Sequence, residues 1–228
     1  MKKKQVNKIL KHVKEDYSAS AEEFDERRQT PWKEFKLFLK YIKNNDKVSD
    51  IGCGNGRFLD FLKNKRKINY TGVDITKNLI DIAKKRYAGT FLVANAFDTG
   101  LKDNQFDTTV SIATLHHIPS KSLREKTIKE MHRITKKEGF FIISVWNLYR
   151  KKFIKYFLRS LIKSIISGFS KNPKDLFIPW GSKKTLRYFY ALSTKEMTKL
   201  IKSNGFEIIE KHKNKNLVYI CKKIGLKF

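Results

Sequence analysis

The chain has 228 residues, enough for one well-cored domain with additions, and this length argues against two full domains. Its 50 Lys and Arg against 22 Asp and Glu give a formal charge of +28, which attracts polyanions and makes nucleic acid the leading partner class. A merely solvated lysine-rich surface is the alternative. No apolar run reaches the roughly 18 residues of a membrane span, the basic start lacks a signal-type apolar region, and Cys53 and Cys221 fit no zinc or disulfide pattern. We therefore expect a cytoplasmic protein without a metal site.

The first half of the chain alternates between strand and helix patterns. Residues 31–42 predict a helix that begins at Pro31, because proline fits a first helical turn. From residue 47 to 150, short apolar runs alternate with amphipathic stretches, the pattern of βαβ units in a parallel sheet. The expected strands are 47–51, 69–74, 90–94, 106–113 and 139–146. Helices are expected after Gly56 and at 78–87 and 122–134, whereas 97–105 predicts none.

An amphipathic segment follows. Its apolar residues recur at 153/154, 157/158, 161/162 and 165/166, and Lys155, Arg159 and Lys163 form one cationic row. Three roles stay open for this helix: docking on the protein's own core, facing RNA, or lying in a membrane interface. The tail then predicts a Ser193-capped helix to Gly205 and a hairpin of strands 206–212 and 217–223.

A glycine-rich loop carries the first chemical signal. In "VSDIGCGNGRFLDFL", Asp50 ends a strand and three glycines precede a helix: Gly52, Gly54 and Gly56. Such glycines allow a tight turn and bring a ligand to the helix N-terminus. The dinucleotide pattern G-x-G-x-x-G would need glycine at Arg57, so the loop alone could be an ordinary turn. Asp74 ends the next strand, 22 residues after Gly52, where a carboxylate can accept both ribose hydroxyls. Together these residues favour a nucleoside-containing cofactor.

Five motifs carry a family resemblance. "DIGCGNG", "GVD", "ANAF", "FDTTVSIATLHHI" and "ITKKEGFFIISVW" together resemble the class I S-adenosylmethionine-dependent methyltransferases over about residues 47–147. The resemblance implies a Rossmann-like α/β fold with a seven-stranded, mostly parallel sheet whose last strand, from the C-terminal hairpin, is antiparallel. We expect an N-terminal helical cap at 1–46 and a methyltransferase domain at 47–228, with a basic amphipathic helical insert at about 150–180.

The resemblance also implies a cofactor, S-adenosyl-L-methionine, and the residues that hold it. Asp50 and the loop glycines would hold the methionine end, Asp74 the ribose, and the residue at 95 the adenine amino group. The family's usual Asp is here Asn95, whose carbonyl oxygen can still accept a hydrogen bond. The expected cofactor site comprises Asp50, Gly52, Gly54, Gly56, Asp74, Ile75, Asn95, Ala96 and Ala113.

Further stretches resemble one branch of this family, the tRNA methyltransferases that esterify the carboxylate of wobble 5-carboxymethyluridine. They are "YSASAEEFDERRQTPW", "SIATLHHI" followed by Arg124, "SVW", and "LFIPWG" with "LRYFYALS", spanning about Tyr17 to Cys221. The resemblance implies that a carboxylate oxygen attacks the methyl carbon on the sulfonium. Because a carboxylate is ionised at pH 7, this transfer needs no general base.

The expected catalytic residues therefore position and clamp a carboxylate. Arg28 and Arg187 could each hold it through two hydrogen bonds, and His116 could donate to it while His117 packs beneath. Trp146 ends a strand on the cofactor side of the sheet and could stack on an extruded base. The alternatives are surface arginines and a tryptophan of the core.

Two other functions fit the same cofactor loop. One is a small-molecule methyltransferase of quinone or other lipid-associated synthesis, with the basic helix docking on a membrane surface. The other is a non-catalytic RNA-binding module that keeps the fold. For the tRNA enzyme the partners would be tRNA and, as the family implies, a small zinc-binding activator protein.

Overall fold

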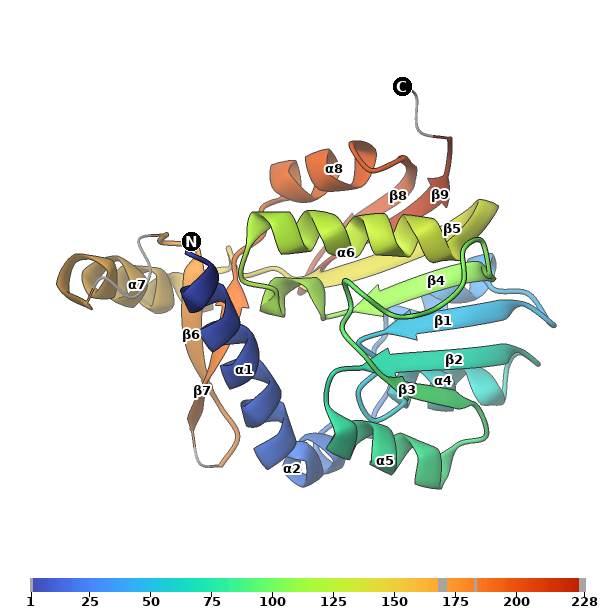
Figure 1. Cartoon of the computed structure of the whole chain (residues 1–228), viewed down its shortest axis with the longest axis horizontal. Helices are drawn as coiled ribbons and strands as arrows, with labels where there is room; N and C mark the ends of the chain where they lie inside the picture. Colours follow the sequence, from blue (N-terminus) through green and yellow to red (C-terminus); the bar gives the residue numbers. More distant parts are fainter. Residues whose placement is uncertain (1, 168–171, 183, 226–228) are drawn as a thin grey trace.

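The computed structural model describes residues 2–167, 172–182 and 184–225 (Figure 1). Its centre is a seven-stranded sheet in the order β3-β2-β1-β4-β5-β9-β8. The strands are β1 (Lys47–Ile51), β2 (Asn69–Asp74), β3 (Thr90–Val93), β4 (Phe106–Ile112), β5 (Thr135–Trp146), β8 (Phe206–Lys213) and β9 (Asn216–Lys223). Neighbours from β3 to β5 pair in parallel, whereas β9 is antiparallel to both β5 and β8. The expected fold is thereby confirmed.

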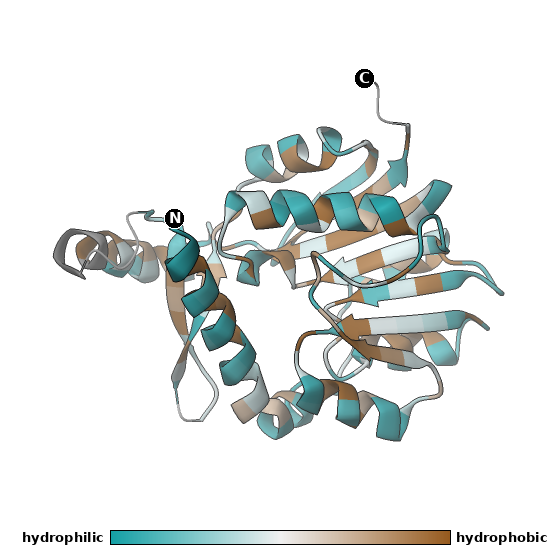
Figure 2. Cartoon of the chain, viewed as in Figure 1, coloured by the Kyte–Doolittle hydropathy of each residue, from teal (hydrophilic) through white to brown (hydrophobic). Residues whose placement is uncertain are grey.

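Helices cover both faces of this sheet. They are α4 (Arg57–Lys63), α5 (Lys77–Arg86), α6 (Lys121–Ile134) and α8 (Thr194–Lys202), with a short 3-10 turn, η2 (Leu115–His117), after β4. Alternate residues of β5 enter different cores: Phe141 and Ile143 join the cluster under α6 and α8, and Ile142 joins the cluster under α4. Figure 2 accordingly shows hydrophobic residues along the strands and mixed surfaces on the helices. Burial on both faces explains why the second half of β5 is almost continuously apolar.

The N-terminal residues form α1 (Lys3–Ala19), α2 (Ala21–Glu26), the single turn α3 (Phe35–Phe38) and the 3-10 turn η1 (Leu39–Tyr41). The helix expected from Pro31 is therefore wrong at its start, since regular helix begins only at Phe35. Aromatic packing explains the difference: the Phe35 ring lies 5.0 Å from that of Phe58, and the Arg57 guanidinium lies 4.5 Å from the ring of Trp32. These tertiary contacts override the local helical pattern.

The insert after β5 is only partly helical. It contains η3 (Lys151–Phe153), α7 (Ile154–Ser167) and a separate hairpin of β6 (Asp175–Trp180) and β7 (Thr185–Tyr190). The expected helical insert at 150–180 is thus corrected at 175–180, and its residues 168–171 lie outside the described residues. "DLFIPW" and "TLRYFY" are rich in aromatic and branched residues that favour strands, and Pro179 is tolerated in so small a sheet because β6 has a free edge.

The N-terminal helices and the insert after β5 both lie at one end of the sheet. In Figure 1, α1 and the β6-β7 hairpin lie beyond the carboxyl ends of β1, β2 and β4. Ligands bind at this edge in open α/β sheets. The fold therefore brings the N-terminal helices and the insert to the edge where a site is expected.

Candidate active site

A cavity opens at the carboxyl ends of the parallel strands. The space between its walls, with the solvent-open mouth included, is about 920 Å³. Its wall comes from elements far apart in the sequence: α1 and α2, the β1-α4 loop, the end of β2, the η2 turn, the end of β5, and β7.

Most of the expected site residues meet here. Those that line the cavity are Arg28, Asp50, Gly52, Gly54, Asp74, Ile75, Ala113, His116, Trp146 and Arg187. Gly56, Asn95 and Ala96 are not in this wall. Gly56 instead precedes α4 with φ +79°, and Asn95 follows the edge strand β3 and pairs with Asp98. The adenine contact at Asn95 therefore stays a prediction.

The glycine loop is sterically constrained at Gly52. This residue has φ +84°, and a Cβ there would lie 1.9 Å from the Thr114 Oγ1. The Gly52 N–H donates to the Val73 carbonyl at 2.7 Å, which ties the loop to β2. Only glycine fits this backbone and this close approach.

Two carboxylates face the cavity in different states. Asp74 accepts hydrogen bonds from the backbone N–H groups of Gly54 (2.9 Å) and Thr76 (2.8 Å), so its orientation is fixed. Asp50 accepts from the Tyr70 hydroxyl at 2.7 Å through Oδ2, whereas its buried Oδ1 has no partner among the described residues. Burial raises the pKa of Asp50 to about 7. An unpaired carboxylate oxygen in such a place suits a cationic ligand group.

Two arginines line the cavity without an anionic partner. The guanidinium groups of Arg28 and Arg57 make no hydrogen bond or ion pair with any described residue, and each packs on an aromatic ring, of Phe24 and Trp32 respectively. Burial lowers the pKa of both, that of Arg57 to about 10. Arg57 was not among the site residues expected from the sequence. The available signal was its position: Arg57 is a cation at the first residue of α4, where the dinucleotide pattern has its third glycine.

His117 belongs to the scaffold of the site. Its Nδ1 lies 2.8 Å from the Tyr188 carbonyl, which can only accept, so the proton is on Nδ1. Its Nε2 therefore accepts from the Tyr17 hydroxyl, also at 2.8 Å. Burial lowers the pKa of His117 to about 3. Both ring nitrogens of this neutral histidine are engaged in joining α1 and β7 to the η2 turn.

His116 has the opposite tautomer. Its Nδ1 accepts from the Trp146 backbone N–H at 3.2 Å, so the proton is on Nε2. This Nε2 is buried without a partner among the described residues, and His116 lines the cavity. Burial lowers the pKa of His116 well below its usual value, so the ring is neutral at pH 7. His116 therefore offers a hydrogen-bond donor and no free base.

The Arg187 guanidinium makes most of its contacts with other residues of the protein. Its Nε donates to Asp16 at 2.5 Å and its Nη2 donates to the Ser20 Oγ at 3.0 Å. The guanidinium also lies between two rings, 3.8 Å from the centre of Tyr17 and 4.1 Å from that of Trp180. Sequence reasoning could not foresee this buried ion pair across 171 positions. Its evident effect is to hold α1 against β7 above the cavity.

The aromatic wall includes Trp146. Its ring stacks on Phe189 with centroids 4.9 Å apart, and Phe189 also stacks on His116 at 5.3 Å. Trp146 is half-buried and lines the cavity. This wall is flat and apolar, which suits a planar ligand group.

Comparisons with known proteins place the chain among methyltransferases. A family model described as a methyltransferase domain matches residues 49–143. The tRNA (carboxymethyluridine(34)-5-O)-methyltransferase alkbh8 of Xenopus tropicalis is 31% identical over 196 residues, which is 76% of this chain and 31% of that protein. The chain thus spans about a third of the length of this curated relative. An uncharacterised protein of Methanocaldococcus jannaschii is 30% identical over 204 residues, 86% of this chain and 77% of the relative.

Solved structures share the fold. A methyltransferase of Methanosarcina mazei, described as S-adenosylmethionine-dependent, superposes with a TM-score of 0.70 at 23% identity, over 82% of this chain and 97% of its own. A Haloferax volcanii protein solved in complex with the methyltransferase activator Trm112 superposes with a TM-score of 0.68 at 17% identity, over 93% of this chain and 98% of its own. At these identities the likeness concerns the fold alone.

Proposed function

The chain belongs to the class I S-adenosylmethionine-dependent methyltransferases, and on that premise we propose that it methylates a carboxylate carried by tRNA, as in a wobble 5-carboxymethyluridine. The observation that carries the proposal is the buried, neutral and unpartnered His116 Nε2–H in the same cavity as the unpaired Arg28. These two groups offer a hydrogen-bond donor and a positive charge, but no histidine that could remove a proton. They therefore suit an acceptor that is already an anion.

The residues of the cavity fit S-adenosylmethionine. The unpaired Oδ1 of Asp50 would hold the ammonium group, the free Arg57 guanidinium the carboxylate of the methionine part, and Asp74 the ribose. When it is bound, this cofactor supplies an electrophilic methyl group on a sulfonium. Because Asp74 already has two backbone donors that fix it, its remaining lone pairs would be presented in a set direction.

The rest of the reaction is positioning. His116 would donate through Nε2 to one carboxylate oxygen of the acceptor, and Arg28 would attract the same group by its charge. Trp146 and Phe189 would stack on a base and exclude water. Arg187 would act indirectly, by holding α1 over the cavity through Asp16. Holding the reactants in line in this way can lower the activation barrier by about 7 kcal/mol or more.

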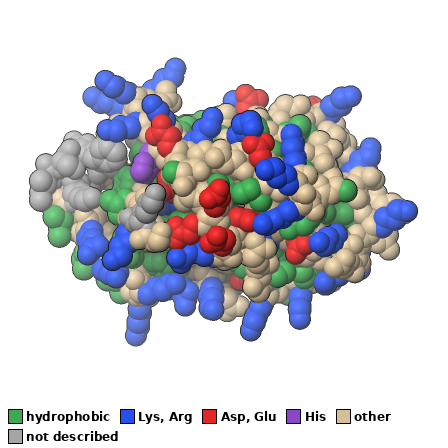
Figure 3. Space-filling view, turned by 90° about the horizontal axis from the view of Figure 1, so that it is seen from below, with side chains coloured by type: hydrophobic (Ala, Val, Ile, Leu, Met, Phe, Trp, Pro, Cys, Tyr) green, Lys and Arg blue, Asp and Glu red, His purple; other side chains and the backbone are tan. Residues whose placement is uncertain are grey.

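The surface supports an RNA partner. Figure 3 shows Lys and Arg side chains around much of the margin of one face, with acidic side chains gathered near its middle. A net charge of +28 would contribute a strong, salt-dependent attraction to the phosphate backbone. We also propose that an activator protein, as in the Haloferax volcanii complex with Trm112, assists this chain, and co-expression followed by co-purification tests that pairing.

The deciding experiment incubates the protein with labelled cofactor and two tRNA samples, one with carboxymethyluridine and one without it. We expect a methyl ester, identified in the digested nucleosides by mass spectrometry and lost on mild alkaline treatment, only in the first sample. Equal labelling of the second sample would contradict carboxylate chemistry.

A second candidate is methylation of a lipid-associated small carboxylate in the same cavity. It is favoured by one observation, the exposed aliphatic residues of α7 in the insert that also supplies Phe189. Transfer to a lipid extract but not to bulk tRNA would support this candidate over the first.

A further inference from the structure

One face of α7 is covered by the insert itself. Phe153, Tyr156 and Phe157 pack into an apolar cluster with Leu176 and Ile178 of β6. This contact agrees with the first of the three roles considered from the sequence, docking on the protein's own core. It leaves the opposite face to be explained, because α7 projects from the side of the molecule away from the seven-stranded sheet (Figure 1).

That opposite face carries an exposed aliphatic stripe. Ile154, Leu158, Leu161 and Ile162 are 54%, 57%, 50% and 55% exposed. At about 100° per residue these four side chains fall within one sector roughly 100° wide. Single exposed aliphatics are normal on a protein surface, but four adjacent ones on one helix form a patch that marks an interaction site.

Cations border this stripe on one side. Lys152, Lys155 and Arg159 are exposed, and none has an ion pair with a described residue. The sequence contains no Asp or Glu between Glu138 and Asp175, so no acidic residue of the segment offsets them. The surface of α7 thus combines aliphatic side chains with uncompensated positive charge.

We propose that α7 lies in the interface of an anionic phospholipid bilayer, with its aliphatic stripe among the upper acyl chains and its cations at the headgroups. Within the described ranges no helix is both long and apolar enough to traverse a bilayer. RNA would pair with the cations but leave the four aliphatic side chains in water. A bilayer satisfies both parts of the surface.

Vesicle sedimentation of the full chain tests this surface, with vesicles of phosphatidylcholine alone and of phosphatidylcholine mixed with phosphatidylglycerol, at physiological salt. We expect binding only to the mixed vesicles. The variant I154S/L158S/I162S should bind them at least about tenfold more weakly, whereas Ile209→Ser, at the 44% exposed isoleucine of β8, should bind as the parent does. The variant K155Q/R159Q should bind the mixed vesicles about thirtyfold more weakly than the parent. The control K102Q/K199Q, which removes two cations elsewhere, should lose much less affinity.

Absence of vesicle binding by the folded parent, or equal losses for the α7 and control variants, would overturn the proposal. So would a loss of tRNA affinity in K155Q/R159Q without loss of vesicle binding, because α7 would then face RNA. Circular dichroism checks that each variant is folded. Methyl transfer to tRNA in solution, measured on the same variants, should not change, so failure of this inference is separable from failure of the proposed function.

Discussion

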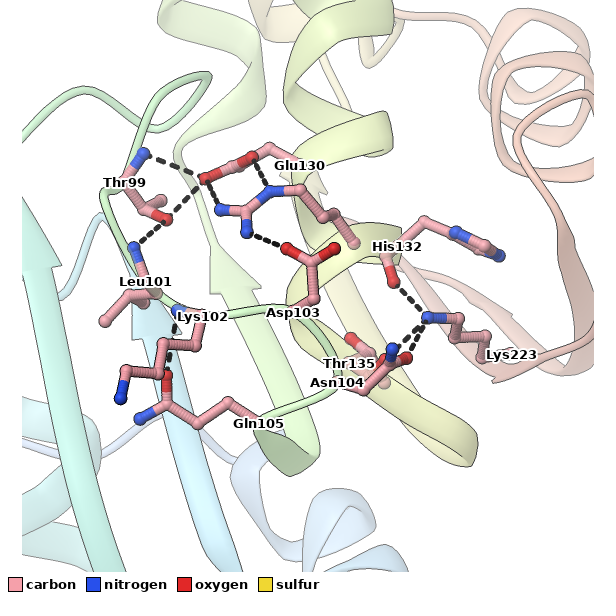
Figure 4. Close-up of polar contacts among 11 residues, drawn as sticks. Thr99, Leu101, Lys102, Asp103, Asn104, Gln105, Glu130, His132, Thr135 and Lys223 are labelled. Atoms are coloured by element: carbon pink, nitrogen blue, oxygen red, sulfur yellow. Dashed lines mark hydrogen bonds and ion pairs between the residues drawn. The ribbon is translucent and has the colours of Figure 1, made fainter.

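Polar groups at the two ends of the central sheet differ in whether they have hydrogen-bond partners within the protein. At the amino ends of the strands, the Glu130 carboxylate accepts from the Thr99 backbone N–H and hydroxyl and from two nitrogens of Arg133, which in turn pairs with Asp103 (Figure 4). Nearby, the Lys223 ammonium donates to three oxygens, of Asn104, His132 and Thr135. Every polar group of this network is satisfied.

At the carboxyl ends, four polar groups of the cavity have no partner among the described residues. They are the fully buried Asp50 Oδ1 and His116 Nε2, and the half-buried guanidinium groups of Arg28 and Arg57. An unsatisfied buried polar group costs about 1–3 kcal/mol. The difference between the two ends supports the proposal that these groups bind ligands.

The largest effect is expected at the satisfied end. Glu130→Ala should lower the free energy of unfolding by about 3 kcal/mol, because it leaves Arg133 and the Thr99 donors without their acceptor. Hydrogen bonds from Arg133 and Thr99 outweigh burial and lower the pKa of Glu130 to about 2, so this contribution is present at neutral pH and lost only as the pH falls toward 2. Denaturant unfolding measures it. Glu125→Ala, at an exposed pair on the same helix, should change little.

Asp50→Asn, at the carboxyl ends of the strands, should weaken cofactor binding and stabilise the fold. Affinity for S-adenosylmethionine should fall about 10- to 150-fold, the loss of one charge-assisted hydrogen bond. Stability at pH 8 should rise, because a buried carboxyl with a raised pKa destabilises the fold as the pH increases from 3.8 through 7. Calorimetry and thermal unfolding measure the two effects. The exposed Asp81→Asn serves as control; a parallel loss of both affinity and stability in Asp50→Asn would break the comparison.

His116→Ala tests the donor assigned to the acceptor carboxylate. We expect methyl transfer to slow by about 10- to 100-fold, with the cofactor dissociation constant nearly unchanged. His116→Gln, whose amide can donate, should recover part of the rate. His132→Ala, at the amino end, should leave the rate of the folded protein intact. Loss of cofactor binding in His116→Ala would mean that the placement is wrong.

The smallest effect concerns pH. Because the pKa of Asp50 is about 7, cofactor affinity should fall about fivefold from pH 7 to pH 6 as this carboxyl takes up a proton. Calorimetry at several pH values shows the slope, and Asp50→Asn should remove it. A flat profile in the parent would mean that Asp50 does not contact a cationic part of the ligand.

Local patterns predicted the central sheet well. β1 and β2 match the expected ranges, since buried strands between glycine and polar turns are recognisable within a few residues. Two segments were misjudged for tertiary reasons. Residues 31–34 do not form helix because Trp32 and Phe35 pack around Arg57, and 175–180 is a strand because it pairs with a segment ten positions later.

By itself, the sequence determined the glycine loop, Asp50 and Asp74, because strand ends and sharp turns are encoded locally. Only the tertiary structure decided the proton positions of His116 and His117, the commitment of Arg187 to Asp16, the availability of Arg28 and Arg57, and the exposed face of α7. Each of these properties depends on groups that lie far apart in the chain. A hydrogen-bond partner or a covering side chain cannot be read from a residue's neighbours in sequence, and that partner decides whether a side chain is scaffold or free to bind a ligand.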